Sequence, residues 1–239
     1  MNKAELLQIA KPILFNTEMV RAILDERKTQ TRRVVKNPAP YYKTKADQAI
    51  RIEKNDDWYK DRHYCIRDNS GGWMDLTKED FIKHCKGYKK DDVLYVRETF
   101  CPAILNMGEE NEEEIVIYKA DDGREWVEPN DGFKTPWKPS IHMPKMFARI
   151  FLKVTNVRVE RLQEIEDNTD NFQAEGYPDS YELKEAKRFY SNDMHGEVDY
   201  CDDCMEEWWT SLWNATTPDG YKWEDNPYVF VYEFERIEV

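Results

Sequence analysis

Two long stretches of the chain have the composition of β-strands, one with alternating apolar residues and one with a continuous apolar and aromatic run, and they constrain the fold more than any other feature. In the first stretch, residues 148–161, apolar side chains recur at every second position, with a change of phase near residue 155: Ile150, Leu152, Val154, Val157 and Val159. The second stretch, residues 227–237, is an apolar and aromatic run. Because a period of two residues is the strand period, these stretches predict a sheet rather than a helical bundle.

The other predicted elements are short and widely spaced. Strands are expected at residues 13–15, 26–35, 91–97 and 114–120, and helices at 17–24, 162–176, 182–189 and 205–213. Asn16 or Thr17 is expected to cap the first helix, and Gly176 to end the helix at 162–176. Residues 36–90 and 98–111 are expected to be irregular or loop-like. This spacing predicts a mixed α/β, mainly β fold, a small β-barrel with short helices.

A single domain over residues 1–239 is expected, with two large insertions at about 36–90 and 177–210. The 8 Trp, 14 Tyr and 10 Phe residues indicate a packed core rather than a disordered acidic chain. No apolar run approaches the ~20 residues that span a bilayer. The first residues resemble no secretory signal, and the odd number of cysteines, 5, fits a reducing compartment. We therefore expect a cytoplasmic protein with no membrane partner.

The formal net charge of −13 excludes a protein that coats nucleic acid through phosphate contacts alone. Any contact with nucleic acid must be local and directed at bases, or the ligand must be small. The densest group of basic residues consists of Arg27, Lys28, Arg32, Arg33 and Lys36. Such a group positions phosphate while a cleft with aromatic side chains reads a base. Candidate stacking residues are Tyr95, Phe100, Trp126 and Trp137.

The run from Ile23 to Arg33 resembles the signature of ASCH domains, which share the PUA-like β-barrel. That signature reads Gly-x-Lys-x-x-Glu/Thr-x-Arg after an apolar helix, and Lys28, Thr31 and Arg33 match it. Further similar pieces are residues 92–96, 157–165, the Ala-Glu-Gly at 174–176, and residues 228–234. Together with the loop 137–144, the resemblance is greatest to a phage-borne group of ASCH proteins and covers pieces of about half the chain.

The resemblance implies a chemistry. One branch of the ASCH family consists of N4-acetylcytidine amidohydrolases that use a Lys, a Thr and a Glu, and the matching positions here are Lys28, Thr31 and Glu175. A threonine hydroxyl becomes a nucleophile when a neighbouring base takes its proton. In one respect the chain departs from the family, because Glu26 stands where a Gly is common. Glu26 therefore either adopts a left-handed conformation at an energetic cost or changes the turn.

A second group of candidate ligand-binding residues lies in and after the Pro-flanked loop around His142. We expect this group to form another wall of the cleft, together with Arg27, Arg32 and Arg33: Lys138, Ser140, His142 and Arg149. Cys201 and Cys204 form one CxxC pair, which is half a zinc site. Its completion would need ligands from elsewhere, such as His63, Cys65, His84, Cys85 or His195. Two free thiols are the simpler interpretation, so no metal and no other cofactor are expected.

Two hypotheses of different classes follow. In the first, the chain recognises a nucleotide, a modified nucleoside or a short single strand in a PUA-like cleft, with amide hydrolysis on a modified base. In the second, it is an acidic phage accessory protein that binds a host protein or mimics nucleic acid without catalysis. The basic residues separate the two hypotheses: a concave lining favours the first, and pairing with surface carboxylates favours the second.

Overall fold

The computed structural model describes residues 2–35, 64–67, 73–105, 113–121, 137–178 and 202–238. The chain forms two compact units. The first unit comprises Met1–Lys28, Asp91–Val154 and Phe234–Val239, and the second comprises Thr29–Lys90 and Thr155–Glu233. The expectation of a single domain stays a prediction.

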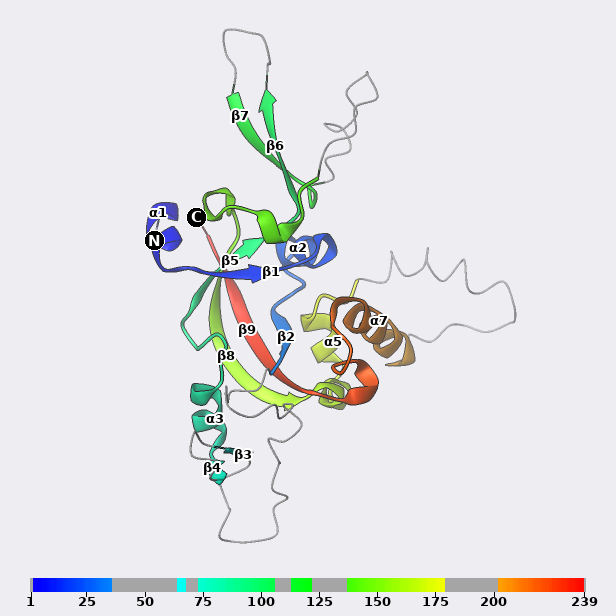
Figure 1. Ribbon diagram of the computed structural model, residues 1–239. Coiled ribbons are helices and arrows are strands. Elements are labelled where there is room, and N and C mark those ends of the chain that lie inside the picture. Colours follow the sequence, from blue (N-terminus) through cyan, green and yellow to red (C-terminus); the bar gives the residue numbers. More distant parts are fainter. Residues whose placement is uncertain are drawn as a thin grey trace, which may run out of the picture. The chain divides into compact units, whose positions relative to one another are not determined.

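The main sheet has five strands in the order β1-β5-β8-β9-β2. Their bounds are β1 Lys11–Leu14, β2 Gln30–Val34, β5 Val93–Arg97, β8 Phe151–Arg161 and β9 Tyr228–Ile237. Strand β1 pairs with β5 in parallel, whereas the pairs β5–β8 and β2–β9 are antiparallel. Strands β8 (yellow-green) and β9 (red) are long and contribute residues to both units (Figure 1). The first was predicted from the alternation of apolar residues and the second from its apolar and aromatic run, and both strands are confirmed.

Among the described strands the sheet is open. Strands β1 and β2 stand at the two ends of the strand order, so no hydrogen-bonded pair joins them there. A closed barrel requires the first and last strands to pair at a suitable tilt and stagger. The mixed α/β fold with most strands in one sheet is confirmed, and the expected closure of the barrel is wrong for these strands. Apolar alternation identifies strands, but it does not specify which edges pair.

The first unit packs short helices and a hairpin around its part of the sheet. Its other elements are α1 Lys3–Ile9, α2 Thr17–Leu24, β6 Phe100–Leu105, β7 Glu113–Tyr118, η3 Ser140–His142 and η4 Lys145–Phe147. Asn16 caps α2, as expected. The loop expected at 98–111 is wrong in part, because β6 pairs with β7. Pro102 within β6 hides the strand pattern, and a two-stranded ribbon tolerates proline because its outer edges are unpaired.

A compact apolar core stabilises the first unit. Its buried members come from α1, the sheet, β6 and the loop that carries η3 and η4: Leu6, Ala10, Tyr95, Phe100, Met143, Ala148 and Phe151. The candidate stacking residues Tyr95 and Phe100 belong to this core, at 8% and 2% exposure. Their side chains are therefore committed to packing and do not present a free face for a base.

The second unit places its helices against β2, β8 and β9. Its other elements are β3 Tyr64–Arg67, β4 Trp73–Leu76, α3 Lys78–His84, η5 Leu162–Asp167, α5 Asp170–Ala174, α7 Asp202–Thr216 and η6 Trp223–Asp225. The helix predicted at 205–213 is confirmed within α7, whereas the helix predicted at 162–176 divides into η5 and α5. The hairpin β3–β4 and helix α3 lie in the region expected to be irregular. The helix expected at 182–189 lies outside the described residues.

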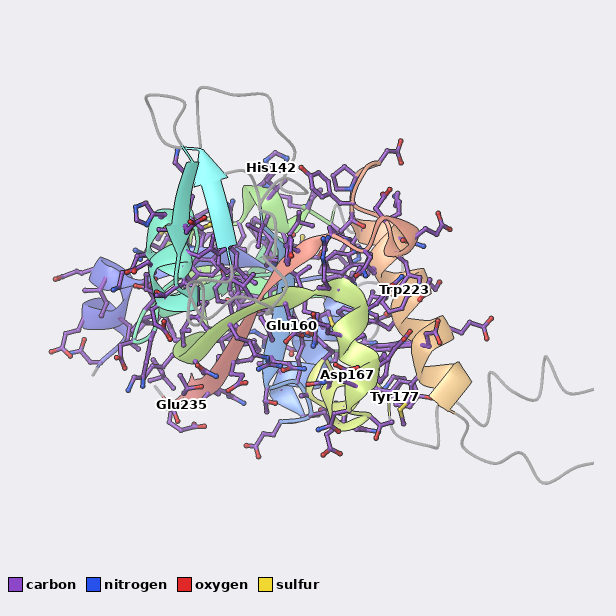
Figure 2. All side chains as sticks on the ribbon, turned by 90° about the horizontal axis from the view of Figure 1, so that it is seen from below. His142, Glu160, Asp167, Tyr177, Trp223 and Glu235 are labelled. Carbon is purple, nitrogen blue, oxygen red and sulfur yellow. The ribbon has the colours of Figure 1, made fainter. Side chains whose placement is uncertain are left out.

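Tryptophans dominate the core of the second unit. Trp209 and Trp213 from α7 pack with Trp223 from η6, and Tyr177 follows α5 (Figure 2). Leu162 and Ile165 of η5, Phe172 of α5, and Val229 and Val231 of β9 complete the buried set. This core fixes α5 and α7 against the sheet face that carries Val34.

Two helices end in the same backbone arrangement. At the end of α5, the N–H of Tyr177 donates to the carbonyl of Phe172 at 3.0 Å, and Gly176 has a φ of 93°. At the end of α2, the N–H of Arg27 donates to the carbonyl of Ala22 at 2.9 Å, and Glu26 has a φ of 61°. Both ends are Schellman motifs, which favour glycine at the left-handed position. Gly176 fits this position, whereas Glu26 adopts it against its steric preference.

We expect Glu26→Gly to raise the free energy of unfolding by about 1 kcal/mol, because a left-handed conformation disfavours any residue with a Cβ atom. Urea denaturation measures the change. The matched control is Glu26→Ala, which removes the same carboxylate but keeps the Cβ atom, so its effect is expected to be smaller. Equal stability of the two variants would contradict the strain at this position.

Candidate functional site

Buried polar side chains concentrate in one short segment. Of the described residues, those that are polar or charged and buried are Lys28, Gln30, Thr31, Arg32, Glu98 and Glu175. Four of them lie between positions 28 and 32. Burial of charged groups is uncommon unless they are paired, and such groups cluster at functional sites. The segment singled out by the sequence is therefore also the most unusual one in its burial.

The alternation of β2 divides this segment between two faces. Gln30, Arg32 and Val34 share one face, and Thr31 and Arg33 share the other. In the antiparallel register, Thr31 lies opposite Tyr232 of β9 and Arg33 lies opposite Phe230. Paired residues in adjacent strands point to the same side of a sheet. Thr31 and Arg33 are thus on the face of the aromatic side chains of β9.

Arg32 is enclosed between two carboxylates. Its side chain has 0% exposure, and its two terminal nitrogens donate to Glu175 Oε1 at 2.9 Å and to Glu160 Oε1 at 2.6 Å. Glu160 lies near the end of β8 (Figure 2). The guanidinium carbon lies 6.0 Å from the centre of the Trp209 ring. Among the described residues, Arg32 Nε has no hydrogen-bond partner. A buried guanidinium in this setting joins β2, β8 and the end of α5.

A second arginine extends this network along the sheet. Arg158 Nε donates to Glu160 Oε2 at 2.9 Å, and its terminal nitrogens donate to Glu233 and, at 3.0 Å, to Gln30 Oε1. Glu160 thus accepts from two arginines. Arg158 and Glu160 alternate with Val157 and Val159 in the sequence, so the strand pattern already put them on one face. Sequence reasoning nevertheless missed them as site residues, because the piece 157–165 that resembles ASCH domains was read only as a strand and a helix.

Glu175 reaches β2 although 143 positions separate it from Arg32. It is the C-terminal cap residue of α5, where the Schellman motif fixes its backbone. The N–H of Thr29 donates to the carbonyl of Ala174 at 2.9 Å, which ties the end of α5 to the start of β2. Glu175 is 1% exposed. The resemblance pointed to this glutamate, and within the second unit it lies beside the predicted segment.

Lys28 belongs to the first unit and is 3% exposed. Its backbone N–H donates to the carbonyl of Ala22 at the end of α2, at 2.9 Å. Its Nζ lies 5.9 Å from the centre of the Phe15 ring. Thr31 and Glu175 belong to the second unit. The convergence of Lys28, Thr31 and Glu175 on one pocket stays a prediction.

The remaining arginines of the basic group differ in their environments. Arg27 pairs at 3.1 Å with Asp25, whose side chain is 58% exposed. Burial lowers the pKa of the Arg33 guanidinium, and the nearby Glu175, Tyr88 and Tyr232 oppose that shift. Glu175 therefore acts electrostatically on both Arg32 and Arg33. Burial likewise raises the pKa of the Tyr232 hydroxyl. The basic group thus combines the surface pair Arg27–Asp25 with the buried pair Arg32–Glu175.

The second predicted group of ligand-binding residues lies in the first unit. Arg149 donates from Nε and a terminal nitrogen to both oxygens of Glu98 at 2.9 Å, and from its other terminal nitrogen to Asp121 at 2.6 Å. Its guanidinium also lies over the Tyr118 ring at 3.9 Å. Lys138 and His142 are exposed and Ser140 is partly buried. Within the described residues Arg149 makes no hydrogen bond to any of these three, because its donors are already engaged.

The ion pair between Glu98 and Arg149 acts on the pKa of both side chains. Burial raises the pKa of Glu98, and the hydrogen bonds from Arg149 act in the opposite direction. Burial also acts to lower the pKa of Arg149, but the hydrogen bonds to Glu98 and Asp121 outweigh it, so the net shift is upward. Every nitrogen of Arg149 is satisfied by a carboxylate. The roles expected for Lys138, Ser140, His142 and Arg149 in ligand binding stay predictions.

Cysteines and metal-binding groups add little in the described ranges. Cys85 and Cys101 are buried free thiols there, and no cluster of three or more His, Cys, Asp or Glu residues in those ranges has metal-binding geometry. Several residues named from the sequence lie outside the described residues: Lys36, His63, Trp126, His195 and Cys201. The side chains of Cys65 and Cys204 lie outside them as well. The interpretation of the CxxC pair therefore stays a prediction.

Comparison of the chain with protein-family models, with curated proteins and with solved structures gave no match. The resemblance to ASCH domains therefore rests on the residues quoted for it. In the described part of the chain, no helix has both the length and the apolar character needed to cross a membrane.

We expect Arg32→Leu to lower the free energy of unfolding by about 3–5 kcal/mol, because two carboxylates lose a buried partner. Arg27→Leu is the matched control. Its partner Asp25 is exposed, so the change is expected to stay below about 1 kcal/mol. Urea denaturation of both variants measures the difference, and equal effects would contradict the structural role of Arg32.

Burial raises the pKa of the Cys85 thiol from 9.0 to about 12. The folded state therefore favours the protonated thiol, and this contribution to stability is lost as the pH rises from 9.0 toward about 12. At pH 8 we expect Cys85 to resist iodoacetamide in the native protein and to react in guanidinium chloride. Peptide mass spectrometry measures the labelling. Rapid labelling of native Cys85 would contradict its burial.

Proposed function

We propose that the chain recognises a nucleobase at the segment from Lys28 to Arg33 and hydrolyses an amide on a modified base. The observation that carries this proposal is the concentration of buried polar side chains at positions 28–32. Thr31 shares the face of β2 that meets the aromatic side chains of β9, and Glu175 accepts a hydrogen bond from the neighbouring Arg32 on the other face. We also propose that the mixed fold is a relative of the PUA-like barrel, as the resemblance implies.

The proposed reaction uses the three residues that the resemblance indicates. The Thr31 hydroxyl attacks the amide carbonyl carbon, and Lys28 accepts the hydroxyl proton and passes it to the leaving amine as the C–N bond breaks. Water then hydrolyses the threonyl ester and releases the carboxylic acid. Arg32 fixes the carboxylate of Glu175, which the resemblance implies as the third residue of the set. Arg27 and Arg33 contribute charge that favours a nucleotide phosphate.

The test compares N4-acetylcytidine with cytidine. We expect the wild-type protein to release acetate from N4-acetylcytidine, as measured by chromatography, and to gain thermal stability with either nucleoside. Thr31→Val removes the hydroxyl at nearly constant volume and is expected to abolish turnover. The matched control is Thr169→Val, the same change at an exposed position outside the segment from Lys28 to Arg33, which is expected to keep activity.

Two outcomes would contradict the proposal. If Thr31→Val turns over as fast as the wild type, Thr31 is not the nucleophile. If no nucleoside, nucleotide or short oligonucleotide raises the melting temperature, the chain does not recognise bases. That second outcome would favour the accessory-protein hypothesis, with which the surface pair Arg27–Asp25 and the net charge of −13 also agree.

A further inference from the structure

The segment Lys83–Lys90 is strongly basic in an acidic protein. Its sequence, KHCKGYKK, holds four lysines and a histidine and no acidic residue, whereas the whole chain carries a net charge of −13. The segment begins in the last turn of α3 and continues as the irregular stretch that follows. It lies outside the pieces that resemble ASCH domains. We call it the basic segment.

The lysines of the basic segment differ in the hydrogen bonds and ion pairs that their side chains make. Lys86 and Lys90 are exposed, and neither pairs with a carboxylate among the described residues. The Lys83 side chain is 71% exposed, and its partner at 3.2 Å, Asp80, is 46% exposed, so this pair exchanges readily with other ligands. Lys89 instead donates to the carbonyls of Ile82 and Cys85 and closes the end of α3. Lys83, Lys86 and Lys90 are therefore available to an anion.

The basic segment is anchored on the sheet of its own unit. The N–H of Tyr88 donates to the Tyr232 hydroxyl at 3.3 Å, and the two rings meet edge-on with their centres 5.1 Å apart. A Cβ atom added to Gly87 would lie 2.4 Å from that hydroxyl and 3.3 Å from the Phe230 ring. Only a glycine allows this close approach. The backbone at Gly87 and Tyr88 is therefore seated directly on β9.

The same face of the sheet carries the residues of the proposed base site. Tyr232 lies opposite Thr31 in the register of β2 and β9, and Phe230 lies opposite Arg33. Tyr88 and Tyr232 both act electrostatically on Arg33. The basic segment thus reaches the face of Thr31 and Arg33 from a distant part of the sequence, and the exposed Lys86 and Lys90 flank the partly exposed Tyr88 in the chain.

From this placement we propose that the basic segment binds the phosphates of a single-stranded nucleic acid whose base is read beside Thr31 and Arg33. This inference rests on the proposed function and specifies its substrate as an oligonucleotide strand rather than a free nucleoside. The charge is local, which suits a few consecutive phosphates, and the acidic remainder of the protein disfavours a long duplex. Tyr88 supplies an aromatic ring next to the lysines, as in sites that bind single strands.

The test measures binding of fluorescein-labelled ten-nucleotide single strands of RNA and DNA as a function of salt. The variant Lys86→Ala/Lys90→Ala removes two exposed lysines of the basic segment. The matched control is Lys3→Ala/Lys119→Ala, which removes the same charge from two exposed lysines of the first unit. Each phosphate contact contributes about −0.7 to the slope of log affinity against log salt, so the first variant is expected to flatten the slope by about 1.4.

The control variant is expected to keep the wild-type slope. If both double variants flatten the slope equally, the effect is one of overall charge and the inference is overturned. It is also overturned if wild-type protein binds vesicles of phosphatidylserine and phosphatidylcholine through these lysines but binds no oligonucleotide. A circular dichroism spectrum equal to that of the wild type ensures that a loss of binding does not reflect unfolding.

The inference and the proposed function fail in different ways. Suppose that Lys86→Ala/Lys90→Ala cleaves free N4-acetylcytidine at the wild-type rate and that its salt slope for oligonucleotides is unchanged. The base site is then intact, and the proposed phosphate binding by the basic segment is rejected. Suppose instead that oligonucleotide binding depends on Lys86 and Lys90, that Thr31→Val binds as the wild type does, and that the wild type shows no turnover. This result would support phosphate binding by the basic segment and reject the amidohydrolase activity.

Discussion

The buried guanidinium of Arg32 is the interaction on which the second unit depends. A charge with 0% side-chain exposure is tolerable only because Glu160 and Glu175 each accept a hydrogen bond from it. The two carboxylates come from the end of β8 and the end of α5, so one side chain of β2 defines where both elements sit. Such a pair adds little to stability over an apolar core, but its removal is costly because Glu160 and Glu175 would each lose a charged partner in a buried setting. The ion pairs of Arg32 therefore determine how β2, β8 and α5 are arranged more than they increase the free energy of unfolding.

The two faces of β2 have different surroundings. On one face, Gln30 and Arg32 belong to the network of arginines and carboxylates that holds the helices of the second unit. On the other face, Thr31 and Arg33 meet the aromatic residues of β9 and the basic segment. The strict alternation of side chains along a strand explains this division. It also explains why adjacent residues of one basic group, Arg32 and Arg33, have different environments.

The sequence predicted the long strands, the helix at 17–24 and the helix end at Gly176, because each depends on local periodicity or local backbone preference. It also directed attention to Lys28, Thr31 and Glu175 through the resemblance to ASCH domains. It failed where the local signal was weak: Pro102 concealed strand β6, and the interruption at Asn168 divided one expected helix in two. It could not indicate that Arg32 is buried, since burial of a charge depends on partners that lie more than a hundred positions away.

By itself, the sequence determined the two long strands, the helix at 17–24, the acidic charge of the chain, and the position of its densest basic group. These properties follow from the order of neighbouring residues. Only the tertiary structure decided that the described sheet is open, that Glu175 meets Arg32, and that Gly87 and Tyr88 pack against Tyr232 on the face of Thr31. Each of these depends on which strand edges and helix ends meet, and that choice is made by packing and hydrogen bonds between residues far apart in the chain.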